Sequence, residues 1–259
     1  MYDVKVSLDR LTLKGTMTSE LEGYLNFSVF VDNRRTAAEP YRWNFNLLDG
    51  SFLQIPQQIN GELRLDFNPT TAHTEIFQVI KRIKDPEPTR VDIAIDYYDI
   101  DLLNNGWNWM HKPVKTRRFF APDGKLETLY IGAPSSDRQI RIYDKAKEQG
   151  IEGRWTRVEV QLRHKACKEL IDPFRDLYAV TELNLSGLKP KEKAIVLYMY
   201  EKNAYTQFDF KTRKKYKDYI LRNSKLLEPQ PKEVWAREKA SILAQILTYT
   251  IGDPMFIIA

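Results

Sequence analysis

The stretch ETLYIGAPSSDRQIRIYDK (residues 127–145) contains two strand-like runs on either side of the turn residues APSSD. A link this short joins antiparallel neighbours, because a parallel crossover needs a dozen or more residues. The runs RVDIAID (90–96) and WTRVEVQL (155–162) add two more strands with alternating apolar residues. We therefore predict an α+β fold built on a mainly antiparallel, curved β-sheet core.

Helices are expected after this β-rich part of the chain. Apolar residues at helical spacing predict one helix over 70–85, and a helical C-terminal third is expected with helices near 164–180, 190–203, 212–223 and 232–250. We divide the chain into a mainly β catalytic core (1–165) and a helical region (166–259), packed together as one compact unit.

The composition is that of an ordinary globular protein. The 259 residues include 42% hydrophobic and 29% charged residues, enough to bury a core without disulfides. No apolar run is long enough to span a membrane, and no signal-peptide segment is evident at the N-terminus. The single cysteine forms no internal disulfide, and the three histidines match no paired metal motif. We expect a cytoplasmic protein.

Positive charge is mild overall but concentrated locally. Forty Lys and Arg against 35 Asp and Glu give a formal net charge of +5. The run KTRKKYK (211–217) supplies five cations, which are Lys211, Arg213, Lys214, Lys215 and Lys217. This clustering favours contact with a polyanion over a merely solvated surface. We predict a basic helix over 211–223 that contacts DNA.

One tyrosine stands among cations in the hairpin. With a period of two, Arg141, Tyr143 and Lys145 share the outer face of a half-buried strand, while Ile140 and Ile142 take the other face. One interpretation is a solvated face that carries an aromatic residue. The other is that Tyr143 is a nucleophile held among cations, Arg141 and Lys145, that bind a phosphate.

Three carboxylates belong to strands with a shared pattern of Thr, Arg, Val and an acid. They are Asp92, Asp96 and Glu159. Carboxylates on neighbouring strands can share Mg²⁺ or Mn²⁺, which prefer hard oxygen ligands, with Arg157 left to bind phosphate. The alternative is a lattice of surface salt bridges to Arg90, Arg141 and Arg157, which would stabilise the fold only weakly.

The same segments resemble rolling-circle replication initiators of Gram-positive plasmids. The resemblance covers about residues 45–222 and rests on RIYDK, RVDIAID and WTRVEV together with LRLDFNP and KTRKKYKDYI. It implies that Tyr143 nicks the plasmid double-strand origin and stays joined to the DNA 5′ end. It also implies a divalent cation, a homodimer, a C-terminal region that recognises an extruded origin hairpin, and a host replicative helicase as partner.

The sequence departs from the family in two places. Gln161 stands where relatives often have a second acid, which puts the full ligand set in doubt, and residues 1–45 match poorly. Tyr97 and Tyr98 are rival nucleophiles, but neighbouring acids would oppose their phenolates.

Three functions stay open on the sequence alone. The first is an ATP-independent nicking-closing enzyme, similar to topoisomerase I, with a covalent phosphotyrosine. The second is a metal-dependent nuclease in which Tyr143 only packs or binds phosphate. The third is a non-catalytic origin-binding protein.

Overall fold

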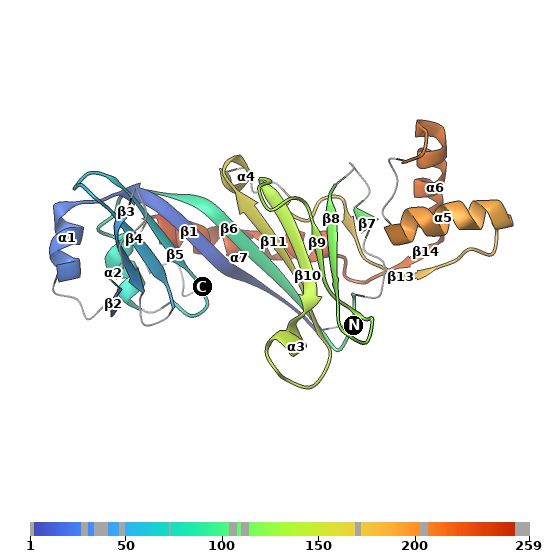
Figure 1. Cartoon of the computed structure of the whole chain (residues 1–259), viewed down its shortest axis with the longest axis horizontal. Coiled ribbons are helices and arrows are strands. Elements are labelled where there is room, and N and C mark those ends of the chain that lie inside the picture. Colours follow the sequence, from blue (N-terminus) through green and yellow to red (C-terminus); the bar gives the residue numbers. More distant parts are fainter. Residues whose placement is uncertain are drawn as a thin grey trace. The chain divides into compact units, whose positions relative to one another are not determined.

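The structure is a computed structural model that describes residues 3–26, 31–33, 41–46, 50–72, 74–103, 108–109, 114–168, 172–202 and 207–251. The strands of its main sheet are β1 (Val4–Thr16), β2 (Val31–Asn33), β3 (Tyr41–Asn46), β4 (Phe52–Pro56), β5 (Glu62–Phe67), β6 (Lys84–Tyr98), β8 (Thr116–Phe120), β9 (Leu126–Ile131), β10 (Arg138–Asp144) and β11 (Trp155–Arg163). Their order in the sheet is β2-β3-β4-β5-β1-β6-β11-β10-β9-β8 (Figure 1). Two small sheets pair β7 (Asn108–Trp109) with β12 (Leu177–Tyr178), and β13 (Val180–Leu183) with β14 (Ser224–Leu226).

The hairpin of β9 and β10 forms as the sequence predicts. The two strands are antiparallel, with Ile140 opposite Ile131 and Tyr143 opposite Thr128. Gly132 begins the turn with a φ of 103°, and a Cβ there would lie 2.8 Å from the carbonyl oxygen of Arg138. Only glycine meets both conditions without strain. The pairs β8–β9, β4–β5 and β1–β5 are also antiparallel, so the predicted α+β class with a mainly antiparallel sheet is confirmed.

The helices are α1 (Ser19–Asn26), α2 (Thr74–Ile80), α3 (Lys145–Glu148), α4 (Lys165–Lys168), α5 (Pro190–Lys202), α6 (Phe210–Asn223) and α7 (Pro231–Ile251). The last three match their predicted ranges closely. The helix expected over 164–180 is wrong, because α4 is the only helix among the described residues of this range and the chain enters β12 at Leu177 and β13 at Val180. Pro173 disfavours helical backbone at the residue before it, and Asp176 has a φ of 65°, outside the right-handed helical region.

The chain divides into two compact units. Unit 1 comprises Met1–Val6, Ala94–Val160 and Ile171–Arg237, and unit 2 comprises Ser7–Ile93, Gln161–Leu170 and Glu238–Ala259. Each unit therefore draws on both sides of the predicted boundary after residue 165. The division into residues 1–165 and 166–259 separates strand-rich from helix-rich sequence, and it stays a prediction as a domain assignment.

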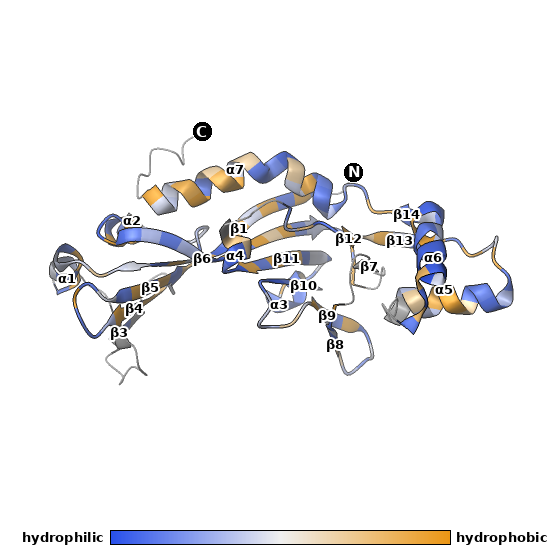
Figure 2. Ribbon diagram, turned by 90° about the horizontal axis from the view of Figure 1, so that it is seen from above, coloured by the Kyte–Doolittle hydropathy of each residue, from blue (hydrophilic) through white to orange (hydrophobic). Residues whose placement is uncertain are grey.

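Each unit has its own apolar core. In unit 1, Ile140, Ile142 and Val158 are fully buried. In unit 2, Tyr249 of α7 packs against Phe67 and Phe77, each with ring centroids 5.0 Å away. Hydrophobic and hydrophilic residues alternate along α7 in Figure 2, as expected for a helix with one buried side. Among the described helices, none combines the length and the hydropathy needed to cross a lipid bilayer.

Candidate functional site

Tyr143 lies on β10 in unit 1 and is buried, with only 5% of its surface exposed. Its hydroxyl donates a hydrogen bond to Oε2 of Glu159 on β11, at 3.3 Å. Both interpretations of the sequence placed Tyr143 on the outer face of a half-buried strand. The structure instead buries the ring, with the guanidinium of Arg141 lying over it and Glu159 of the neighbouring strand bonded to its hydroxyl.

Arg141 and Lys145 both lie near the ring of Tyr143, but they belong to different elements. Arg141 ion-pairs with Oε2 of Glu159 at 2.8 Å, and its guanidinium carbon lies 4.1 Å from the ring centroid of Tyr143. Lys145 is not in line on the strand, since β10 ends at Asp144 and Lys145 begins α3. The amine of Lys145 still lies 5.7 Å from the same centroid, and it pairs with Glu148.

The environment of Tyr143 favours its neutral form. Burial raises the pKa of the phenol most, and the nearby Glu159 carboxylate raises it further, whereas Arg141 and Arg157 act in the opposite direction. The net pKa lies above the ordinary value, so the cations alone do not produce a phenolate. Glu159 is instead the group that could accept the phenol proton during a reaction.

Asp96 is held by a buried ion pair with Arg157. Nε and Nη2 of Arg157 donate to the two carboxylate oxygens at 2.7 and 2.8 Å, and Nε1 of Trp155 donates a third bond at 2.7 Å. The exposed fractions of Asp96 and Arg157 are 2% and 8%. The sequence predicted Asp96 as a metal ligand and Arg157 as a phosphate-binding cation. In the structure these two residues form an ion pair with each other.

Asp92 is buried in unit 2 and has its own partners. Nε of Arg90 donates to it at 2.9 Å, and Nε2 of Gln161 donates at 3.1 Å. Burial raises the pKa of Asp92, against the opposing effect of Arg90. Gln161, the position where the sequence departs from the family, thus supplies a hydrogen bond to a predicted metal ligand.

The predicted metal ligands do not form a ready-made site. Among the described residues, no group of three or more His, Cys, Asp and Glu side chains is placed to hold a metal ion. Asp92, Asp96 and Glu159 each have an arginine partner instead. As described, these carboxylates do not fit a preformed three-carboxylate cation site, and Mg²⁺ or Mn²⁺ binding stays a prediction.

The basic segment forms α6, as predicted, and packs on α5 through Val196, Met199, Tyr216 and Ile220. The five cations of this segment differ in how freely they could contact a phosphate. Lys211 and Lys214 are exposed, Lys215 ion-pairs with Glu192 at 2.7 Å, and Arg213 lies over the ring of Phe210. Burial lowers the pKa of Lys217, followed by repulsion from Arg213.

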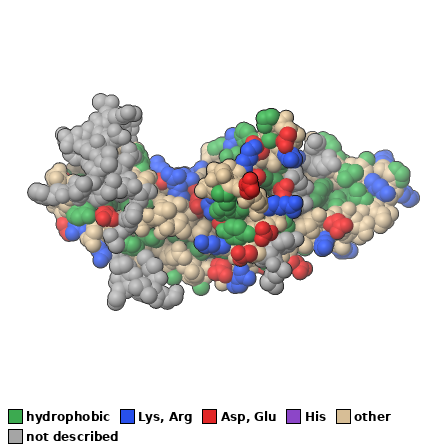
Figure 3. Space-filling view, turned by 90° about the horizontal axis from the view of Figure 1, so that it is seen from below, with side chains coloured by type: hydrophobic (Ala, Val, Ile, Leu, Met, Phe, Trp, Pro, Cys, Tyr) green, Lys and Arg blue, Asp and Glu red, His purple; other side chains and the backbone are tan. Residues whose placement is uncertain are grey.

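The described surface does not carry one continuous basic patch on the side drawn in Figure 3. Lys and Arg side chains there are interspersed with Asp and Glu side chains. DNA binding by general attraction is therefore a weaker explanation on this side than contacts by particular residues.

The rival tyrosines are less suited to attack than Tyr143. Tyr97 is fully buried and donates to the carbonyl oxygen of Pro229 at 3.2 Å. Burial, followed by Asp96, raises the pKa of Tyr98, and its ring packs 5.3 Å from that of Trp155. Tyr98 also lies near a carboxylate and a guanidinium, but these are Asp96 and Arg157, which bind each other.

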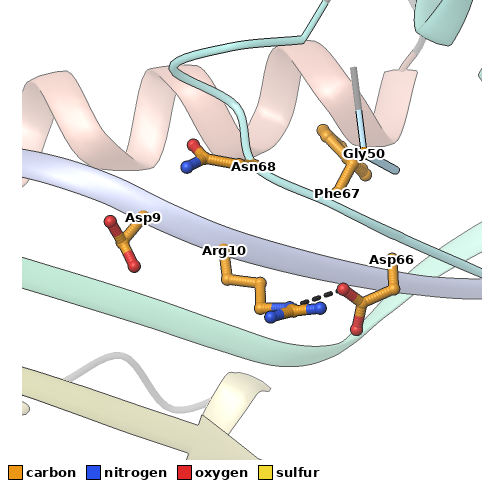
Figure 4. A pocket seen from close by; sticks show the side chains of 6 residues that line it. All are labelled: Asp9, Arg10, Gly50, Asp66, Phe67 and Asn68. Carbon is orange, nitrogen blue, oxygen red and sulfur yellow. Dashed lines mark hydrogen bonds and ion pairs between the residues drawn. The ribbon is translucent and has the colours of Figure 1, made fainter. Parts of the chain in front are cut away.

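Sequence reasoning missed a small polar pocket in unit 2. It has a volume of about 140 Å³ and is lined by Asp9, Arg10, Gly50, Asp66, Phe67 and Asn68 (Figure 4). Asp66 is buried and accepts bonds from Nε of Arg10 at 2.5 Å and from Oγ1 of Thr12 at 2.8 Å. The pocket contains none of the predicted site residues. The alternating pattern of a strand does not show which residues from separate strands will line a pocket together, so the sequence did not predict this one.

Comparison with known proteins gives consistent matches. The sequence model of a family described as replication initiation factor matches residues 86–241, a range that includes Tyr143 and α6. Two replication initiation proteins from Staphylococcus aureus are 30% and 32% identical over 172 residues. These alignments cover 61% of this chain but only 54% of each relative, so the chain spans about half their length.

One solved structure has a similar fold. It is described as a rolling circle replication initiator protein from Geobacillus stearothermophilus, with a TM-score of 0.50 and 17% sequence identity. The alignment covers 74% of this chain and 91% of that one. At this identity the likeness concerns the fold alone.

Proposed function

Because the chain belongs to the family of replication initiation factors, we propose that it starts rolling-circle replication by nicking a plasmid double-strand origin with Tyr143. The observation that carries this proposal is the arrangement around the phenol. Its hydroxyl donates to Glu159, which also pairs with Arg141, and two cations lie beside the ring. An aromatic residue that served only to fill the core would not need these groups.

The proposed reaction is a strand transfer that conserves the phosphodiester bond energy. The Tyr143 oxygen attacks phosphorus and passes its proton to Glu159, while the bond from phosphorus to the 3′ oxygen breaks. The 5′ phosphate stays on Tyr143, and the released 3′ oxygen takes up a proton and becomes the hydroxyl that can prime synthesis. Reversal of these steps closes the strand without ATP, as in a topoisomerase I-like enzyme.

Cations stabilise the negative charge that grows on the phosphoryl oxygens, usually the largest catalytic effect in such sites. Arg141 and Lys145 are the proposed groups. Each now pairs with a carboxylate, so binding of a phosphate would require it to exchange partners. A divalent cation, Mg²⁺ or Mn²⁺, would supply further charge neutralisation when bound. Asp92, Asp96 and Glu159 stay the ligands predicted from the sequence, and each would first have to release its arginine partner.

Origin recognition is assigned to α6 and the segment after it. Lys211 and Lys214 are exposed on α6 and can neutralise phosphates, which position a protein on DNA. Arg157 is a weaker candidate than the sequence indicated, because it is buried against Asp96. A homodimer, an extruded origin hairpin and a host replicative helicase remain proposed partners.

The test is a denaturing gel of the protein incubated with a supercoiled plasmid that carries the coding sequence and its flanking DNA, with Mg²⁺. We expect a nicked strand with protein on its 5′ phosphate. Tyr143→Phe keeps the packing of the ring and removes only the nucleophilic oxygen, so the adduct should vanish while DNA binding survives. An adduct that forms with this variant, mapped to another tyrosine, would refute the assignment.

The burial of Tyr143 and its raised pKa favour one alternative. In a metal-dependent nuclease, activated water would cleave the strand and Tyr143 would only pack. Cleavage by Tyr143→Phe without any covalent adduct would identify that enzyme. Absence of cleavage by the unsubstituted protein with every divalent metal tried would indicate a non-catalytic origin-binding protein.

A further inference from the structure

Strand β8 is the last strand in the order of the main sheet, and it exposes an unusual set of side chains. Its sequence TRRFF contains no acid, and Arg117 and Arg118 are exposed. Phe119 and Phe120 are 50% and 58% exposed. Two exposed phenylalanines beside two arginines are costly on a surface that only meets water, so a ligand is a reasonable explanation.

The strand register places part of β8 on the same sheet face as Tyr143. Phe119 lies opposite Thr128, which in turn lies opposite Tyr143. Arg117 lies opposite Tyr130, which lies opposite Arg141. Directly paired residues project to the same face, so these six side chains form two adjacent rows that lead to Tyr143.

Arg118 belongs to the other face. It lies opposite Leu129, which pairs with Ile142, and both of these side chains are buried. Arg117 and Arg118 are therefore neighbouring exposed cations of the same kind, and only the first lies in the rows that lead to Tyr143.

Contacts connect the side chains along these rows. The guanidinium carbon of Arg117 lies 5.2 Å from the ring centroid of Tyr130, and the rings of Phe119 and Tyr130 meet edge to face at 5.7 Å. Arg141 lies opposite Tyr130 in the strand register and over the ring of Tyr143. We call Arg117, Phe119, Tyr130 and Arg141 the edge strip.

We propose that the edge strip binds unpaired DNA nucleotides beside the scissile phosphate. This rests on the proposed function in taking Tyr143 as the nucleophile. Single strands bind to proteins by stacking bases on exposed aromatic rings and placing phosphates near cations. Phe119 offers the ring and Arg117 offers a charge, and Arg141 offers a second charge once it exchanges Glu159 for a phosphate. A duplex keeps its base faces stacked inside the helix, so it cannot use Phe119 in this way.

The experiment measures fluorescence anisotropy of a labelled oligothymidine of about 12 nucleotides, within the usual site size for such surfaces. Phe119→Ala should weaken binding about tenfold, the lower part of the range for loss of one stacked base, and Phe119→Tyr should restore it.

Arg117→Ala should lower the slope of log affinity against log salt by about 0.7, the value for one single-strand phosphate. Arg118→Ala is the matched control and should leave the affinity within about twofold of the original value and the slope unchanged.

Three outcomes would overturn the proposal. They are unchanged binding by Phe119→Ala, an equal effect of Arg117→Ala and Arg118→Ala, and equal binding of a duplex of the same length. Dimerisation that depends on Phe119 without DNA, seen by size-exclusion chromatography, would also overturn it by assigning β8 to a second copy of the chain. Binding is measured in the Tyr143→Phe background as well, so loss of the nicking assignment and loss of the edge strip give separate results.

Discussion

At the scale of single residues, Glu159 is the carboxylate that contacts both Tyr143 and Arg141 in the candidate site. It accepts from the phenol of Tyr143 and pairs with Arg141 through the same oxygen, Oε2. The carboxylate therefore raises the pKa of the phenol and is also the nearest described group able to take its proton. A neutral tyrosine hydrogen-bonded to a carboxylate that can accept its proton suits an enzyme that forms its nucleophile only when DNA is bound.

The raised pKa of Tyr143 predicts a pH dependence of stability. Burial and Glu159 keep the phenol protonated in the folded state at a pH where the unfolded chain has lost that proton, above about pH 10. This contribution is therefore complete below pH 10 and is lost as the pH rises towards the folded pKa. In urea unfolding at about pH 9 and pH 11, Tyr143→Phe should lose less free energy of unfolding than the unsubstituted protein. An equal loss in both proteins would contradict the prediction.

At the scale of elements, the pair of Arg157 and Asp96 connects β11 to β6 inside unit 1. Arg157→Ala would leave the buried carboxylate of Asp96 without its cation, with the neutral indole of Trp155 as its remaining described side-chain donor. We expect a loss of about 3–5 kcal/mol in the free energy of unfolding, measured with urea. The double variant Arg157→Leu with Asp96→Leu removes both charges and should recover much of that loss. A loss below about 1 kcal/mol for Arg157→Ala would place the pair among weak surface bridges.

Helix α6 provides a second test at this scale. Lys214 is exposed, whereas Lys215 is held by Glu192 and must give up that ion pair to reach a phosphate. Lys214→Ala should reduce the salt slope of binding to duplex origin DNA by about 0.9, the value for one phosphate contact. Lys215→Ala should reduce it less, and the double variant should flatten the plot most. An unchanged slope in the double variant would place the DNA surface elsewhere.

At the scale of the whole molecule, covalent strand transfer predicts relaxation of supercoiled DNA. The phosphotyrosine keeps the bond energy, so nicked plasmid should be closed again and appear as relaxed circles in an agarose gel without ATP. If a divalent cation neutralises the reacting phosphate, EDTA should stop relaxation, while DNA binding, which rests on phosphate contacts, should persist in a gel-shift assay. Relaxation that continues in EDTA would remove the metal from the proposal.

The sequence alone determined the antiparallel hairpin, the strands around Asp92 and Glu159 and the basic helix, and it indicated Tyr143 as the candidate nucleophile. Alternating residues and short links are local features, and local features fix which side chains share a strand face. The tertiary structure decided that Tyr143, Asp92 and Asp96 are buried, that Lys145 begins a helix, and that each predicted metal ligand is paired with an arginine. It also placed Arg117 and Phe119 in rows that lead to Tyr143. These outcomes depend on which strands become neighbours, and a period-two pattern contains no information about its partner across the sheet.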